Sequence, residues 1–399
     1  MKKNIGIFMP SSKSGGVFQL GLSIADSLIN YSDKFNYKII HYNFDDPRHF
    51  LNIDENKTQF LPIPQKSISP IEKILHFSNL IFGGSRFIVN NYDPFFKKTN
   101  INLLIYPTPF TYGFSYKIPY IVFIPSLMHH YYPNFPEFGI KQRITRDAVY
   151  GYYAKNSIFN VVDSEQGAED IFKFLGISKE KSRIIPFVPA GYIYQYKDMN
   201  TKSIEETLAE YNLPEKFLFY PAQFWYHKNH SRLLEAISLI KQNYQIKIPL
   251  VLVGSAKGHY EKRYNRIQTL IPKLNLDGQI RHLGYVSDKT IVALYHKATA
   301  LIFPSLFGPT DIPCLEAMVL GTPVVCSNLF EIPKQVGEAG LLFNPFKVED
   351  IAEKIYRIWT DENLRWELVR NGRERAKDIT LENYAKNWEE IIEEALKKL

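Results

Sequence analysis

Residues 300–320 read ALIFPSLFGPTDIPCLEAMVL and contain one complete strand–loop–helix unit. The apolar run Ala300–Phe303 is typical of a short buried strand, and the Pro- and Gly-rich segment after it indicates a turn. Thr310 or Asp311 can cap a helix whose first turn accommodates Pro313. A strand that leads through a short loop into a helix is the building unit of a parallel α/β sheet.

The same alternation of strand and helix extends along the whole chain. Further strand-like runs occur at 4–9, 37–42, 103–106, 120–124, 158–162, 184–185, 217–221, 250–253, 280–283 and 324–326. Helical patterns separate them, for example at 17–28, 231–241, 260–274 and 289–297. Periodicity is weak between residues 189 and 207, so we place a linker there. We therefore predict an α/β fold with two Rossmann-like domains, residues 1–195 and 196–381, followed by an amphipathic helix at 382–399.

Composition excludes several other classes of protein. The 399 residues are 45% hydrophobic and 22% charged, which is ordinary globular usage and excludes disordered, collagen-like and coiled-coil chains. The two cysteines, Cys314 and Cys326, have no partners at zinc-ligand spacing and suggest a reducing compartment. The apolar run Ile5–Met9 is too short for a signal peptide or a membrane span. We expect a cytoplasmic protein whose membrane contact, at the inner face of the plasma membrane, would be peripheral.

The net charge of +7 is concentrated in the first half of the chain. Residues 1–199 carry 22 Lys and Arg against 16 Asp and Glu, whereas residues 200–399 carry 26 against 25. This bias suits an anionic ligand, an anionic membrane face or nucleic acid, and equally a solvated basic surface. Since no dense block of Lys and Arg occurs, nucleic acid is not among the partners that we predict.

Loops after the predicted strands are the places where an open α/β sheet binds ligands. After the first strand, Gly15 and Gly16 permit close approach of a phosphate to a helix start, although they also fit a simple turn. The segment is neither G-x-G-x-x-G nor a Walker A sequence, so it does not favour a nicotinamide cofactor or a P-loop. After the strand at 217–221, Lys228 and Gln223 could contact a phosphate, or Lys228 could be a solvated loop residue.

The loop within 300–320 and the loop at 284–288 offer further donors. The helix start near Thr310 presents free amides and a positive dipole end to a pyrophosphate. Glu316 could accept hydrogen bonds from a vicinal diol such as a ribose, or merely compensate the helix dipole. Tyr285 and Val286 could stack on a nucleobase, or form an ordinary turn.

These residues, in this order, resemble a known family. Leu283–Val286, Ile302–Leu306, Glu316–Met318, Gly321–Val325 and Gly340–Phe343 resemble the retaining glycosyltransferases of family 4 (group 1), which have the GT-B fold. The match covers nearly all of residues 217–360 and is weaker before them. The resemblance implies two Rossmann-like domains facing each other across a cleft. The C-terminal one would bind a UDP- or GDP-sugar, and the N-terminal one, joined by the helix 382–399, a saccharide or lipid-linked saccharide acceptor.

The resemblance also assigns roles to individual residues. Lys228 corresponds to the diphosphate lysine, Gln223 falls where many members have arginine, and Glu316 corresponds to the second glutamate of the E-x7-E motif, the ribose ligand. The first glutamate is replaced by Gly308, as in a subgroup that lacks it. The backbone amides around Pro309 to Ile312 and the side chains of Thr310 or Asp311 are the available substitutes.

A second departure lies at residues 124–133, where related sequences have a His-Asp pair followed by another histidine. Only His129 has a clear counterpart, with His130 beside it. A histidine there could bind a sugar hydroxyl or a phosphate oxygen, or be satisfied by the backbone.

From these observations we predict a hexosyltransferase that retains anomeric configuration, needs no metal or other cofactor, and serves surface polysaccharide biosynthesis. The predicted catalytic residues are Lys228, Gln223 and His129, and the predicted acceptor-binding residues are His129, His130 and Tyr131. The predicted donor-binding residues are Gly15, Gly16, Lys228, Tyr285, Val286, Ser305, Gly308, Pro309, Thr310, Asp311, Ile312, Leu315 and Glu316. The alternatives are a non-catalytic nucleotide- or carbohydrate-binding protein of GT-B type, a nucleic-acid-binding protein, and a sugar-nucleotide epimerase.

Overall fold

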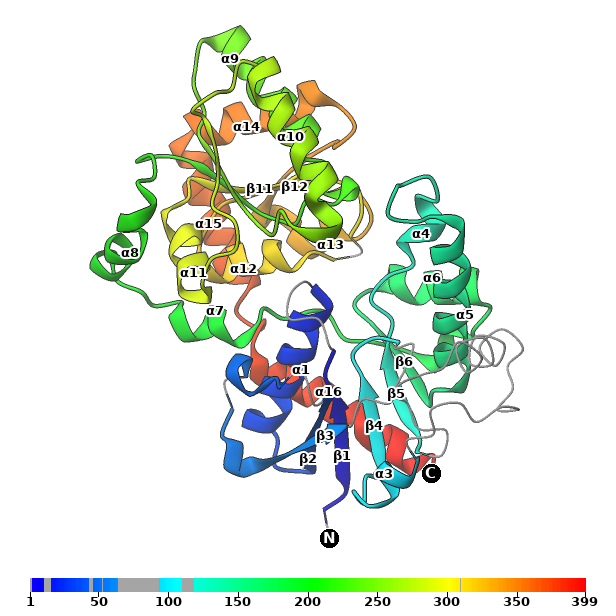
Figure 1. Ribbon diagram of the computed structural model, residues 1–399. Coiled ribbons are helices and arrows are strands. Elements are labelled where there is room, and N and C mark those ends of the chain that lie inside the picture. The colour runs from blue at the N-terminus through cyan, green and yellow to red at the C-terminus, as the bar shows by residue number, and fades with distance from the viewer. Residues whose placement is uncertain are drawn as a thin grey trace. The chain divides into compact units, whose positions relative to one another are not determined.

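The computed structural model describes residues 2–10, 16–42, 46–51, 53–63, 93–109, 118–308 and 310–399. The chain divides into two compact units, of which unit 1 comprises Met1–Gly191 with Thr380–Leu399 and unit 2 comprises Tyr192–Ile379. Each unit is built on one parallel β-sheet with helices around it (Figure 1). The predicted α/β fold with two Rossmann-like domains is therefore confirmed.

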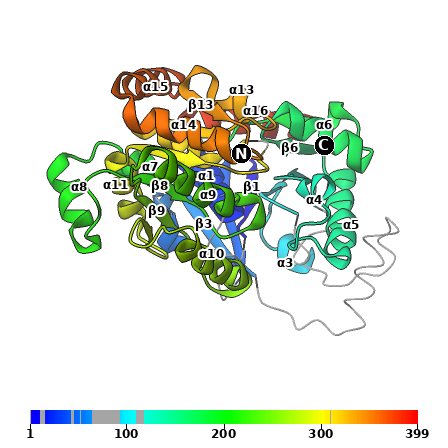
Figure 2. The same ribbon diagram turned by 90° about the horizontal axis from the view of Figure 1, so that it is seen from above.

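Unit 1 contains a seven-stranded sheet in the order β3-β2-β1-β4-β5-β6-β7. Its strands are β1 (Asn4–Phe8), β2 (Asn36–Tyr42), β3 (Thr58–Ile63), β4 (Leu103–Tyr106), β5 (Tyr120–Phe123), β6 (Phe159–Val162) and β7 (Ser182–Ile184). Its helices are α1 (Gly16–Tyr31), α3 (Asp93–Lys97), α4 (Met128–Tyr131), α5 (Ile140–Asn156), α6 (Glu165–Leu175) and α16 (Leu381–Lys397). The central strands β4 and β5 are buried along their whole length, which explains their continuously apolar sequence. Figure 2 shows α5 and α6 side by side, with α4 next to them.

The last helix of the chain, α16, completes unit 1. It packs along α1, and its Trp388 is fully buried. Lys34, just beyond α1, lies 2.8 Å from a carboxylate oxygen of Glu393 and 3.4 Å from one of Glu389. Arg183 on β7 pairs with Glu394. These contacts explain why a helix that ends the sequence folds with the first unit.

Unit 2 contains a six-stranded sheet in the order β10-β9-β8-β11-β12-β13. Its strands are β8 (Leu218–Pro221), β9 (Leu250–Val253), β10 (Ile280–His282), β11 (Ala300–Phe303), β12 (Val324–Ser327) and β13 (Gly340–Phe343). Its helices are α8 (Thr201–Leu208), α9 (His230–Tyr244), α10 (Glu261–Lys273), α11 (Asp288–Lys297), α12 (Ile312–Leu320), α13 (Ile332–Val336), α14 (Val348–Thr360) and α15 (Glu362–Arg375), with α7 (Gly191–Tyr196) at the junction of the units. Because β8 and β11 are neighbours, the loops that follow them lie at the same edge of the sheet.

Short 3-10 helices occur in several of the connections. They are η1 (Arg48–Phe50), η2 (Glu55–Lys57), η3 (Lys179–Lys181), η4 (Ala209–Tyr211), η5 (Tyr226–Lys228), η6 (Gly258–Tyr260) and η7 (Gly337–Ala339). Of these, η5 matters for function because it ends at Lys228, between β8 and α9. No helix in the part of the chain that the structure describes has both the length and the apolar character to cross a bilayer.

Candidate functional site

The loops after β8 and β11 bring Lys228 and Asp311 together in unit 2. The Lys228 ammonium lies 3.6 Å from Asp311 Oδ1 and 4.6 Å from the centre of the Phe303 ring. The hydroxyl of Tyr220 on β8 donates a hydrogen bond to the Lys228 carbonyl over 2.6 Å. The Leu306 amide donates to the His227 carbonyl over 2.7 Å, which fastens the two loops to each other. Lys228 is thus held at the carboxyl end of the sheet, as the strand pattern predicted.

Asp311 is a buried carboxylate immediately before α12. Burial raises its pKa to about 6, and the nearby Lys228 limits this rise. Its backbone amide donates to the side-chain oxygen of Gln335 over 2.9 Å, and the Gln335 amide group donates back to its carbonyl over 3.2 Å. Asp311 does not cap α12 with its side chain, and its Oδ2 has no hydrogen-bond partner among the described residues. This oxygen is therefore a buried acceptor without a hydrogen bond in the part of the chain that the structure describes.

Gly308 leaves the space that the Asp311 carboxylate occupies. A Cβ atom at position 308 would lie 2.4 Å from Asp311 Oδ2 and 2.7 Å from Asp311 Cγ and Oδ1. A side chain at 308 would therefore meet the carboxylate in its observed position, and the Asp311 side chain would have to shift to admit it.

Glu316 lies inside α12 and is 93% buried. Its Oε2 accepts a hydrogen bond of 2.7 Å from the Tyr295 hydroxyl, and its Oε1 accepts one of 3.2 Å from Tyr192. Burial raises the pKa of Glu316 to about 7, although both hydrogen bonds oppose the rise. A carboxylate that only compensates the helix dipole would face solvent, so this arrangement argues against that alternative.

Gln223, predicted to be catalytic, and the other residues predicted to bind the donor fall into different environments. Gln223 accepts hydrogen bonds from Trp225 and Tyr260, both 3.0 Å, so its amide nitrogen is the end that could reach an anion. The fully buried Ser305 hydroxyl donates to the Phe307 carbonyl over 2.6 Å, which fixes the turn after β11. Tyr285 is 71% exposed. Val286 and Leu315 are buried, Ile312 and Thr310 are half-buried, and Gly16 begins α1. Gly15 and Pro309 lie outside the described residues.

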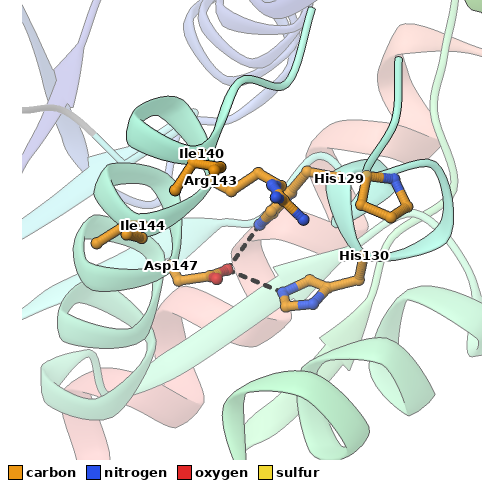
Figure 3. Close-up of a pocket in the computed structure, with 7 residues that line it drawn as sticks. His129, His130, Ile140, Arg143, Ile144 and Asp147 are labelled. Carbon is orange, nitrogen blue, oxygen red and sulfur yellow. Dashed lines mark hydrogen bonds and ion pairs between the residues drawn. The ribbon is translucent and has the colours of Figure 1, made fainter.

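A pocket of about 310 Å³ lies in unit 1 next to the predicted acceptor residues. It is lined by His129, His130, Pro133, Ile140, Arg143, Ile144 and Asp147 (Figure 3). Asp147 on α5 accepts contacts from His129 Nε2 at 2.6 Å and from His130 Nε2 at 2.8 Å, both on the same oxygen, Oδ1. Burial lowers the pKa of His129, so its ring is neutral at pH 7 and donates its Nε2 hydrogen to Asp147.

The Tyr131 side chain contacts α6 and not the pocket. Its hydroxyl donates to Asp170 over 2.6 Å and accepts from Gln166 over 3.1 Å, both on α6, and it does not line the pocket. Arg143 and Asp147, which do line it, were not predicted. Their spacing of four residues places them on one face of a helix, but no sequence signal connects that face with His129.

Part of the chain resembles known glycosyltransferases in sequence. Residues 203–375 match the family described as glycosyl transferases group 1. An O-antigen chain mannosyltransferase B of Escherichia coli is 34% identical over 156 residues, 39% of this chain and 40% of its own length. A serotype-specific mannosyltransferase WbdA of Escherichia coli is 27% identical over 238 residues, 59% of this chain and 28% of its own length. The chain thus spans less than half the length of these relatives.

Solved structures resemble the chain over its full length. WaaG, a glycosyltransferase involved in lipopolysaccharide biosynthesis, has a TM-score of 0.70 at 16% identity over 98% of this chain and 99% of its own. Sucrose-phosphate synthase of Thermosynechococcus elongatus has a TM-score of 0.73 at 20% identity over 100% of both chains. The chain is therefore a protein of GT-B fold whose residues 203–375 match the glycosyl transferases group 1 family.

Proposed function

We propose that the protein is a retaining glycosyltransferase of family 4 that transfers a hexose from a UDP- or GDP-linked donor to a saccharide or lipid-linked saccharide. The observation that carries the proposal is the pairing of Lys228 with the buried Asp311 at the start of α12. The relatives named as mannosyltransferases favour a mannosyl group, and a role in surface polysaccharide biosynthesis follows from the O-antigen relative. HepE of Anabaena, solved with UDP-glucose, has a TM-score of 0.74 at 15% identity over 98% of this chain and 99% of its own, which keeps UDP among the candidates.

In this proposal the leaving diphosphate is stabilised by groups of unit 2. As the anomeric carbon becomes cationic, negative charge develops on the phosphate oxygens. The Lys228 ammonium and the positive end of the α12 dipole supply preorganised positive charge at that place, with Gln223 as a further donor. These groups would make a divalent ion unnecessary for the departure of the diphosphate. Retention would follow from attack on the face that the leaving group vacates.

Asp311 would take the part of the glutamate that is missing at position 308. Its carboxylate lies within 2.7 Å of the position that a Cβ at 308 would take, and its Oδ2, which has no hydrogen bond among the described residues, would accept one from a sugar hydroxyl. The ion pair with Lys228 keeps Asp311 ionised at neutral pH, despite its raised pKa of about 6. When the diphosphate binds, it would compete with Asp311 for the Lys228 ammonium. Donor binding would therefore replace the Lys228–Asp311 salt bridge with a contact between Lys228 and a phosphate.

We place the acceptor site in unit 1, at the pocket beside His129 and His130. The apolar side chains of Ile140 and Ile144 next to Arg143 and Asp147 suit a saccharide, which presents C–H surfaces as well as hydroxyl groups. A cytoplasmic location, with peripheral contact to an anionic membrane, fits a lipid-linked acceptor and belongs to the same proposal.

A thermal-shift screen with UDP-, GDP-, ADP- and CMP-sugars tests the donor, because a bound ligand raises the melting temperature by mass action. We expect a shift with UDP- or GDP-sugars and slow hydrolysis of the same donor without acceptor. Binding without hydrolysis or transfer would favour the alternative, a non-catalytic binding protein, which the loss of the glutamate at Gly308 allows. If none of the four nucleotide classes shifts the melting temperature, the proposal is wrong.

A further inference from the structure

Three potential metal ligands converge on one point in unit 1. They are the imidazoles of His129 and His130 on α4 and the carboxylate of Asp147 on α5 (Figure 3). One ligand atom from each residue lies within 4.8 Å of the other two. Two imidazole nitrogens with one carboxylate oxygen form a donor set that suits Zn²⁺ and neighbouring divalent transition metals.

The two imidazoles converge on a single atom. Both direct Nε2 at Asp147 Oδ1, at 2.6 and 2.8 Å, and each donates a hydrogen to one of its lone pairs. Since a cation can replace both hydrogens, the arrangement is the protonated form of a three-ligand site. A tetrahedral ion with bonds of about 2.0 to 2.1 Å requires roughly 3.3 Å between its ligand atoms. The cluster must therefore open by about half an ångström or slightly more.

The surroundings fix the histidines and leave Asp147 free to make that adjustment. The His129 side chain is 1% exposed, while the His130 ring stacks on Phe174 with centroids 4.3 Å apart and planes 6° apart. The side chain of Asp147 is 42% exposed at the edge of the pocket. Rigid imidazoles with one movable carboxylate can close around an ion without disturbing the core.

The pocket provides the open coordination position. Its volume of about 310 Å³ lies against the three ligands and accommodates water or a larger oxygen ligand. Arg143 lines the same pocket, and its Nε has no partner among the described residues. A guanidinium near a dication is repulsive, so a bound ion and Arg143 would together attract an anionic oxygen ligand.

We propose that His129, His130 and Asp147 bind one divalent transition metal ion of the Zn²⁺ class, with an open position directed into this pocket. The three ligands line the pocket that we assign to the acceptor, and the inference adds a metal ion to it, whereas Lys228 and α12 of unit 2 stabilise the leaving diphosphate in the proposed reaction. Metal binding is measured without donor, acceptor or turnover. Failure of the metal proposal therefore leaves the proposed reaction untouched, and the reverse also holds.

Co²⁺ is the probe, because its visible absorption reports the number and type of ligands. Full-length protein freed of metals is titrated with Co²⁺ and, in a calorimeter, with Zn²⁺. We expect one ion per chain, intense visible bands, and an affinity at least tenfold weaker in Asp147→Asn. Glu169→Gln on α6, an exposed carboxylate outside the pocket, is the matched control and should bind as the wild type does. Absence of a bound ion in the wild type, or equal affinity in Asp147→Asn, overturns the proposal.

Two further variants guard against a misfolded Asp147→Asn protein. His130→Gln removes the more accessible imidazole and should also weaken Co²⁺ binding at least tenfold and change the spectrum. Arg143→Gln removes a neighbouring positive charge and should tighten Co²⁺ binding severalfold in buffer without phosphate. Unchanged binding in His130→Gln, or weaker binding in Arg143→Gln, would place the ion elsewhere and overturn the proposal.

Discussion

Replacing Glu316 by glutamine should stabilise the protein while it weakens donor binding. The pKa of the buried Glu316 is raised from an ordinary 4.5 to about 7, so the folded protein binds this proton more tightly than the unfolded chain does. The stabilisation from this proton is complete below pH 4.5 and is lost as the pH rises through 7. A shift of this size corresponds to about 3 kcal/mol at 1.36 kcal/mol per pH unit. Glutamine is neutral at every pH and can still hydrogen-bond with Tyr295 and Tyr192.

The assay is urea denaturation of wild type and Glu316→Gln at pH 5 and pH 8. We expect the variant to gain up to about 3 kcal/mol in the free energy of unfolding at pH 8 and little at pH 5. Other titrating groups, including Asp311, are present in both proteins and largely cancel in the difference. Glu367→Gln on α15 replaces an exposed glutamate and is the control, for which we expect no gain at either pH.

Calorimetry with the nucleotide sugar found in the thermal-shift screen completes the experiment. If Glu316 is the ribose ligand, Glu316→Gln should bind the donor more weakly, since a carboxylate accepts stronger hydrogen bonds than an amide. A gain in stability together with a loss of affinity is typical of a group kept for function. Equal pH dependence of stability in the two proteins would refute the buried-charge argument, and equal affinity would refute the ribose assignment.

Three further predictions concern the same loops and the helix that completes unit 1. Lys228→Ala should lower kcat/KM by about 30- to 1000-fold, the equivalent of about 2 to 4 kcal/mol. The control Lys247→Ala replaces an exposed lysine after α9 and should leave kcat/KM unchanged. Equal rates in the two variants would contradict the phosphate role of Lys228. Gly308→Glu alone should lose donor affinity because the new side chain displaces Asp311. In calorimetry, the double variant Gly308→Glu/Asp311→Gly should bind the donor at least tenfold more tightly than Gly308→Glu. Equal affinities of these two variants would show that Asp311 does not stand in for the missing glutamate. In urea denaturation, Trp388→Ala should lower the free energy of unfolding by about 3 to 5 kcal/mol because Trp388 is fully buried. Trp366 is 67% exposed, so Trp366→Ala should cost less than about 1 kcal/mol. Similar losses in the two variants would contradict the placement of α16.

The parallel sheets were predictable from sequence because strands covered on both faces are apolar at every position. Leu103–Tyr106 and Ala300–Phe303 are such runs, and both are fully buried central strands. Their order in the chain, with helices between them, then dictates parallel pairing. The same logic directed attention to the loops after β8 and β11, where Lys228 and Asp311 were found together.

The sequence pattern does not predict contacts between segments that lie far apart in the chain. Tyr192 donates to Glu316, which lies 124 positions further along the sequence, and no pattern in either segment predicts this contact. Asp147 reaches His129 from the next helix, which depends on the angle between α4 and α5. Ser305 was predicted to bind the donor, and its sequence context gave no sign that its hydroxyl donates to the Phe307 carbonyl. Hydrophobic periodicity specifies which face of an element is buried, but not which polar groups meet there.

The E-x7-E departure shows why a missing residue must be judged together with its surroundings. Sequence alone indicates a carboxylate lost at Gly308, which is compatible with loss of catalysis. The structure places Asp311 Oδ2 2.4 Å from the position that a Cβ at 308 would take, so a carboxylate from a different backbone position occupies that space. Because Asp311 also pairs with Lys228, a donor that displaces one partner must satisfy the other.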